Sequence, residues 1–216
     1  MRSKWAWMIC LAVAVAGGWG VTTMAQPADQ PPRFKQLTMD ELTPAQKPLG
    51  EQIVKVSSLG IGGPYNLLLR SPVLGQKVFD QLDYLRWHTS VPTRLNEFAI
   101  LIIGRQWRSQ VEWGAHAPLA EKAGLSPKVI ASLKAGKRPE GMAEDEAVVY
   151  DFVTELTTTR SVSDATFART RKAFSEQQIV DLTATSGTYV MLAMQMSMSR
   201  QGLPPGREPA FKVGEP

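Results

Sequence analysis

Three side chains able to exchange protons stand near the middle of this 216-residue chain: Glu97, Glu112 and His116. Histidine has an ordinary pKa close to neutral pH, so its imidazole is suited to work as a general acid or base. His116 is one of only two histidines in the sequence. The pattern favours acid–base chemistry at His116. The alternative is that His116 has only a structural role, as a core histidine that is hydrogen-bonded to a carboxylate.

The spacing of these residues requires a break in the chain. Glu97 and His116 are 19 positions apart. That separation is about 28 Å along one continuous helix, whereas acid–base partners must approach to about 3 Å. Ser109 to Glu112 read S-Q-V-E, the S-x-x-E pattern of a helix N-terminus. The chain can therefore fold back at this point and bring Glu97 near His116.

The apolar spacing predicts helices throughout the chain. Around the break we expect a helix over 93–107, a turn at 108–109 and a second helix over 110–123, with Glu112 and His116 one turn apart on one face. Further helices are expected over residues 43–57, 71–88, 126–135, 143–159 and 175–200, together with a short helix after residue 163. In the first of these, Pro44 is expected to be the first helical residue. A short turn is expected at 66–69. No long alternating pattern occurs, so the predicted fold class is an all-α, single-domain helical bundle.

Several short motifs occur in a recognisable order: Gly63-Pro64-Tyr65-Asn66, Ser71-Pro72, Glu97-Phe98-Ala99-Ile100-Leu101, Arg105, Glu112-Trp113, His116 and Ala120 through Ala123-Gly124-Leu125. In this order and spacing, roughly residues 60–200 resemble the carboxymuconolactone decarboxylase family, whose redox branch is the alkylhydroperoxidase D-like proteins. The resemblance implies a bundle of the alkylhydroperoxidase D-like type, assembled as a homo-oligomer, a trimer or hexamer. It also implies that the loop around Gly63 covers a pocket.

The chain departs from the redox branch in its cysteines. That branch carries a Cys-x-x-Cys pair at the start of the second helix, where Ser109 and Glu112 stand here. The only cysteine is Cys10. Disulfide redox chemistry requires a thiolate and a second, resolving thiol, so the cysteine-dependent peroxidase activity of that branch is excluded.

The candidate catalytic residues are His116, Glu112 and Glu97. Glu112 is also explained as a capping residue, and Glu97 as a carboxylate in the first turn of its helix. Because Glu97 precedes an apolar run, burial and a need for a partner are expected. The candidate substrate-binding residues are Arg105, Trp113 and Asn66: Arg105 could pair with Glu97 or bind a substrate carboxylate. Core packing is the alternative for Trp113.

We expect neither a metal nor a cofactor. His88 and His116 are far apart and lack the spacing of metal ligands. A run of methionines in an exported protein could bind copper, but Met191, Met194 and Met198 recur at helical spacing. That spacing predicts that these three side chains face the core.

Residues 1–25 have the pattern of a secretory signal peptide: Arg2 and Lys4, an apolar stretch, and Thr23-Met24-Ala25 as a cleavage site. The alternative is an uncleaved anchor, for which the three glycines within the apolar stretch are poorly suited. The predicted location is periplasmic or secreted, with no stable membrane anchor after cleavage. The rest divides into an N-terminal arm (26–42), the helical domain (43–200) and a C-terminal tail (201–216).

The formal net charge of +4 falls to +2 once Arg2 and Lys4 are removed with the signal, which is too weak for a nucleic-acid partner. The resemblance implies a carboxy-lyase that removes CO₂ from a small carboxylated lactone or related acid. His116 would donate the proton, and Glu112 or Glu97 would orient the His116 side chain. Arg105 would bind the carboxylate of the substrate. The alternative is a non-catalytic member that binds a small acid.

Overall fold

A computed structural model describes residues 31–57, 59–203 and 206–211. The predicted signal peptide lies outside these residues, as do the first part of the arm and the last part of the tail. The described chain is all-α, as predicted. Its elements are η1 (Met39–Glu41), α1 (Lys47–Val56), α2 (Pro64–Leu68), α3 (Pro72–Asp83), the π-helical turn η2 (Tyr84–His88), α4 (Thr93–Gln106), α5 (Gln110–Lys122), α6 (Pro127–Lys134), α7 (Glu144–Thr159), α8 (Asp164–Ala173) and α9 (Glu176–Ser199).

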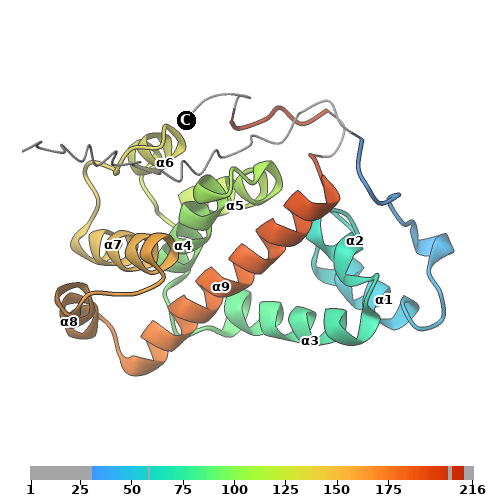
Figure 1. The fold of residues 1–216 in the computed structure, drawn as a ribbon, viewed down its shortest axis with the longest axis horizontal. Coiled ribbons are helices and arrows are strands. Elements are labelled where there is room, and N and C mark those ends of the chain that lie inside the picture. Colours follow the sequence, from blue (N-terminus) through green and yellow to red (C-terminus); the bar gives the residue numbers. More distant parts are fainter. Residues whose placement is uncertain (1–30, 58, 204–205, 212–216) are drawn as a thin grey trace, which may run out of the picture.

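Helix α4 forms the centre of the core. Every residue from Leu95 to Gly104 is buried, because the apolar run Phe98–Ile103 leaves no polar stripe on that part of the helix. Helices α5, α7 and α9 all pack against it. The long helix α9 crosses the molecule diagonally, with α1, α2 and α3 on one side and α4 to α8 on the other (Figure 1). None of the described helices is long and apolar enough to span a bilayer.

The helix N-termini follow the serine signals in the sequence. Ser109, Ser126, Ser163 and Ser175 each accept a hydrogen bond from a backbone N–H in the first turn of the helix that follows. A serine at this position satisfies one of the amide groups that a helix start leaves without a partner. Helices α5, α6, α8 and α9 therefore begin where the sequence predicts.

Two of the predicted element boundaries were wrong. The first helix begins at Lys47 rather than Pro44. Residues 44–46 form a turn instead, in which the Gln46 side chain accepts hydrogen bonds from the N–H and hydroxyl of Thr43. The segment around Asn66, expected to be a short turn, is the five-residue helix α2. Pro64 starts that helix with its φ angle already fixed.

Helical spacing placed one of the three predicted core methionines of α9 correctly. Met191 packs against the core, but Met194 and Met198 are about half exposed, and Met196 is buried in a small cluster with Leu67 and Val111 instead. An i, i+3, i+7 stripe predicts that residues share a face. It does not identify which face meets a neighbouring helix, and here the neighbours of the last turns of α9 contact Met196 instead.

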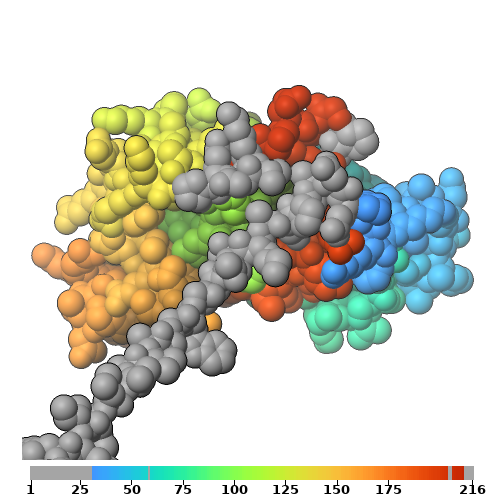
Figure 2. Space-filling model, turned by 45° about the horizontal axis from the view of Figure 1, so that its top comes forward, coloured from blue at the N-terminus to red at the C-terminus, as the bar shows by residue number. Residues whose placement is uncertain are grey.

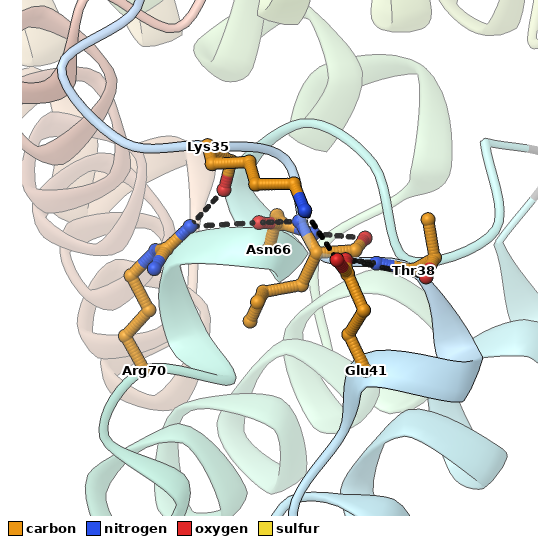
Figure 3. A network of polar contacts seen from close by, with 6 residues as sticks. Lys35, Thr38, Glu41, Asn66 and Arg70 are labelled. Atoms are coloured by element: carbon orange, nitrogen blue, oxygen red, sulfur yellow. Dashed lines mark hydrogen bonds and ion pairs between the residues drawn. The ribbon is translucent and has the colours of Figure 1, made fainter.

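Asn66 attaches the N-terminal arm to the bundle. Its side chain accepts a hydrogen bond from the backbone N–H of Leu37 and donates to the carbonyls of Leu37 and Ile61. Arg70 donates to the Lys35 carbonyl, and Lys35 pairs with Glu41 (Figure 3). The arm then meets the end of α9, where the Arg33 N–H donates to the Ser199 carbonyl at 2.9 Å. In Figure 2 the arm, in blue, lies against the orange-red end of α9.

The close packing of α3 against α2 and α1 depends on Gly75. A Cβ atom at this position would lie 2.4 Å from the Leu68 carbonyl oxygen and 2.9 Å from a methyl of Leu49. Because backbone cannot move aside cheaply, Gly75→Ala is expected to lower the free energy of unfolding by about 1–3 kcal/mol. Chemical denaturation measures this change.

Gly187 on α9 provides the matched control for Gly75. It is exposed, and a Cβ there would meet nothing within 4 Å. Gly187→Ala should raise the free energy of unfolding by about 0.5–1 kcal/mol, because alanine restricts the unfolded chain and favours helix. Changes of the same sign in the two variants would contradict the assignment of Gly75 as a contact point between helices.

Candidate functional site

The turn between α4 and α5 brings the candidate residues together. Trp107 ends α4, Arg108 has a φ of 52°, and the Ser109 N–H donates to the Gly104 carbonyl at 2.8 Å. A left-handed residue followed by such a backbone bond is a common way to end a helix. The chain reverses at the position that the sequence predicts, so that α5 returns along α4.

Glu97 of α4 and His116 of α5 form a buried pair. Nδ1 of His116 lies 2.6 Å from a carboxylate oxygen of Glu97, and both side chains are about 7% exposed. A carboxylate accepts, so Nδ1–H is the donor, and the hydrogen bond fixes which ring nitrogen carries that proton. The other nitrogen, Nε2, then acts as a base in the neutral ring and as an acid in the protonated ring.

Helix α9 holds the imidazole from a third direction. The ring of Tyr189 meets the ring of His116 edge to face, with centroids 5.0 Å apart. The position of α9 is fixed relative to α4 by a buried hydrogen bond, in which the Thr185 hydroxyl donates to the Asn96 side chain at 2.9 Å. These contacts leave the ring of His116 little freedom to turn, which suits a group that must present one nitrogen to a ligand.

Glu112 is buried without a hydrogen-bond partner. It is 3% exposed, and neither carboxyl oxygen is bonded to any described residue. The Ser109 hydroxyl accepts a bond from the Glu112 N–H, but the Glu112 carboxyl does not bond back to Ser109, so the predicted capping box is only half formed. Burial raises the pKa of the Glu112 carboxyl to about 8, and the nearby Ser109 hydroxyl, which makes no well-formed hydrogen bond to the carboxyl, opposes this only in part.

Glu112 and His116 open onto one cavity of about 290 Å³, close to the lower end of the range for small-molecule sites. Its walls come from elements distant in sequence. They are Val56, Ser57, Leu59, Pro64, Tyr65, Leu82, Arg86, Val111, Glu112, Gly114, Ala115, His116, Pro118, Leu119, Tyr189, Leu192, Leu203 and Arg207. Leu59 and Pro64 belong to the loop that the sequence resemblance places over a pocket. The lining is mainly apolar, with a few polar groups near His116.

A second hollow, of about 470 Å³, adjoins the cavity, because Arg86 and Leu119 line both spaces. Glu97 lines the second hollow together with Thr93, Trp87 and Lys122. The three candidate catalytic residues thus do not all line one space: Glu112 and His116 line the cavity, whereas Glu97 lines the second hollow.

The three candidate substrate-binding residues do not line the cavity. Arg105 donates from Nε to the Lys134 carbonyl at 3.0 Å and lies over the ring of Phe211. Trp113 is buried and meets the same ring edge to face, so core packing is its role in the structure. Asn66 is buried under the N-terminal arm. The predicted position of Arg105 as anion anchor is therefore corrected, because its side chain turns towards α6 and the C-terminal segment.

Sequence reasoning missed Arg86, Tyr65 and Tyr189, which supply polar groups to the cavity. Arg86 belongs to the π-helical turn η2, a geometry that often occurs at functional sites. Its guanidinium lies 4.6 Å from the ring centre of Trp87, and its buried Nε has no hydrogen-bond partner among the described residues. In this part of the sequence only His88 was considered as a possible site residue.

The arrangement can transfer a proton to or from a small, largely apolar molecule. His116 presents one nitrogen of a fixed tautomer, and Glu112 presents an acid whose raised pKa keeps it protonated near neutral pH. Neither a family model nor a curated protein matches this chain.

Proposed function

We propose that this chain is an exported carboxymuconolactone decarboxylase-like lyase that acts on a small carboxylated lactone or a related acid. The pairing of Glu97 with His116 beside a cavity is the observation that carries the proposal. The order of the sequence motifs and the all-α bundle are compatible with it. The existence of a cavity next to the histidine also favours catalysis over a purely structural role for this pair.

The proposed reaction needs no electron donor or acceptor. The carbon–carbon bond to the carboxylate breaks, CO₂ leaves, and the electron pair passes into the conjugated lactone as a dienolate. Protonated His116 then delivers the proton on Nε2 to carbon, which shifts the double bond. Glu97 holds Nδ1–H and stabilises the positive charge of the ring before the transfer.

Substrate selectivity in this scheme comes from the shape and chemistry of the lining. The apolar walls exclude water from the reacting carbon, which strengthens each electrostatic contact within the cavity. The modest volume favours one small ring over a polymer or a nucleotide. A neutral Glu112 adds no negative charge that would repel an anionic substrate.

The test is a turnover assay on the purified chain with carboxymuconolactone, in which CO₂ release and substrate absorbance are followed together. We expect one CO₂ for each substrate consumed. The negative control is the double variant Glu97→Gln/His116→Gln, which removes both members of the pair and leaves no unpaired buried charge. Absence of CO₂ release, or equal rates for the two proteins, would refute the proposal.

A further inference from the structure

Three of the buried polar atoms without a partner are gathered at one cavity. In the described part of the chain five such side-chain atoms occur: Arg86 Nε, Glu112 Oε1, Glu112 Oε2, Thr154 Oγ1 and Gln195 Oε1. The first three belong to residues that line the space beside His116. Unsatisfied buried groups are rare because each loses its bonds to water without replacement. Their concentration at one place points to a ligand that supplies the missing partners.

From this placement we infer that Arg86 and Glu112 together bind the carboxylate of the ligand, with Arg86 supplying the positive charge and Glu112 donating a hydrogen bond as a neutral acid. The inference rests on the proposed function, since it names the class of substrate for the same cavity. The ligand class is a small carboxylate with an apolar body. In this site Glu112 contributes a hydrogen-bond donor and adds no negative charge that would repel the carboxylate of the ligand.

The two residues are not each other's partner. Arg86 makes no ion pair with Glu112 in the structure, and its charge is not among the causes of the pKa shift of Glu112. Both residues nevertheless act on Tyr189: the charge of Arg86 lowers the pKa of its hydroxyl and that of Glu112 raises it, while burial, the largest cause, raises it further. Arg86, Glu112 and Tyr189 all line the same cavity, and a carboxylate bound between Arg86 and Glu112 would neutralise the first and accept from the second.

Burial, and not a neighbouring charge, keeps Glu112 neutral, because no charged group is among the causes of its pKa shift. The other titratable groups that line the cavity are Tyr65 of α2, Arg86 of η2, His116 of α5, Tyr189 of α9 and the exposed Arg207 of the C-terminal segment. Helix α4 presents Gly104 to the Cβ of Glu112 and so brings no charge there. Helix α6 packs against α5 but adds no residue to the lining. Burial then keeps the proton on Glu112 near neutral pH.

The test uses benzoate as the probe and isothermal titration calorimetry on the full chain. Benzoate should bind at least tenfold more tightly than benzamide, its uncharged analogue, at about pH 7. Arg86→Met should abolish this preference. Arg105→Met is the matched control, because Arg105 lies outside the cavity. This variant should prefer benzoate over benzamide by the same factor as the wild type. Thermal melting verifies that each variant is folded.

The pH dependence tests the role of Glu112. Above about pH 8 the free protein loses the proton of Glu112, so benzoate must bring a proton back when it binds. The affinity should fall by up to about tenfold for each pH unit, with proton uptake visible as a dependence of the binding enthalpy on the buffer. Glu112→Gln, which keeps a donor but cannot ionise, should bind benzoate at about pH 7 and show no such fall.

Three outcomes would overturn the inference: no benzoate binding at millimolar concentration, an unchanged preference in Arg86→Met, or the same fall with pH in Glu112→Gln. These outcomes are separable from failure of the proposed function, because benzoate is a probe of binding and not a substrate. Benzoate binding with the expected dependence but no CO₂ release would retain the carboxylate site and reject the lyase. CO₂ release without any benzoate binding would reject the carboxylate site and retain the lyase.

Discussion

Turnover by the proposed lyase should fall by about 10²–10⁴-fold when His116 is replaced by glutamine, the range typical of a lost general acid or base. Glutamine has an amide of similar polarity but cannot deliver a proton from a titrating nitrogen. Measurement of kcat and kcat/KM for CO₂ release determines whether the loss is in chemistry or in binding. A fall in kcat with little change in KM is expected, because His116 acts on the reacting carbon and the anchoring of the carboxylate is assigned to other residues.

The second histidine of the chain is the natural control. His88 lies at the end of η2, its side chain is 65% exposed and it contacts Asp83 at 3.5 Å. His88→Gln should leave kcat unchanged. Because His116→Gln leaves Glu97 buried without a cationic partner, circular dichroism and the double variant with Glu97→Gln separate a chemical defect from unfolding. A folded His116→Gln variant with wild-type kcat would contradict the assignment.

The wild-type protein should become less stable as the pH rises from about 5 to about 8, and Glu112→Gln should remove this loss. Burial raises the folded-state pKa of Glu112 from an ordinary value of 4.5 to about 8. Between these values the folded state binds more protons than the unfolded state, so the free energy of unfolding decreases with pH by at most about 1.4 kcal/mol per unit. Above about pH 8 both states are ionised and the penalty stays constant.

Urea denaturation at about pH 5, 6.5 and 8 measures this effect. Glu112→Gln and the wild type should be similar at the lowest pH, where the carboxyl is neutral in the folded state. At about pH 8 the variant should be more stable by about 2 kcal/mol or more. Glu121→Gln is the control, because Glu121 is an exposed carboxylate on the same helix and its replacement should change little. Parallel curves for Glu112→Gln and the wild type would show that the buried carboxyl does not have a raised pKa.

The fold-back of α4 and α5 could be predicted because its signals are local. The serine at 109 and the glycine at 124 mark the limits of the second helix, and the 19-residue separation of Glu97 and His116 requires a reversal between them. Which carboxylate pairs with the imidazole could not be decided in this way. Glu112 is one turn from His116 on the same helix, but the bonded partner is Glu97 on the neighbouring helix, a choice determined by how the two helices pack.

The anion anchor was misplaced for a geometric reason. Arg105 is eight residues beyond Glu97 on α4, which displaces it by about 12 Å along the helix and turns it about 80° around the axis. Its side chain therefore points towards α6 and the C-terminal segment and not into the cavity. Arg86 was missed because a π-helical turn has no signature in a 3.6-residue pattern. Tyr189 was missed because the sequence of α9 shows which residues can be buried, not which of them border a cavity.

The Glu97–His116 pair borders two spaces, because His116 lines the cavity and Glu97 lines the second hollow. In the proposed reaction Nε2 gives its proton to the molecule in the cavity while Nδ1–H stays bonded to Glu97, so a new proton must reach Nε2 through the cavity itself. The acid is therefore recharged only after the product has left, which places product exit and reprotonation in a fixed order within each turnover.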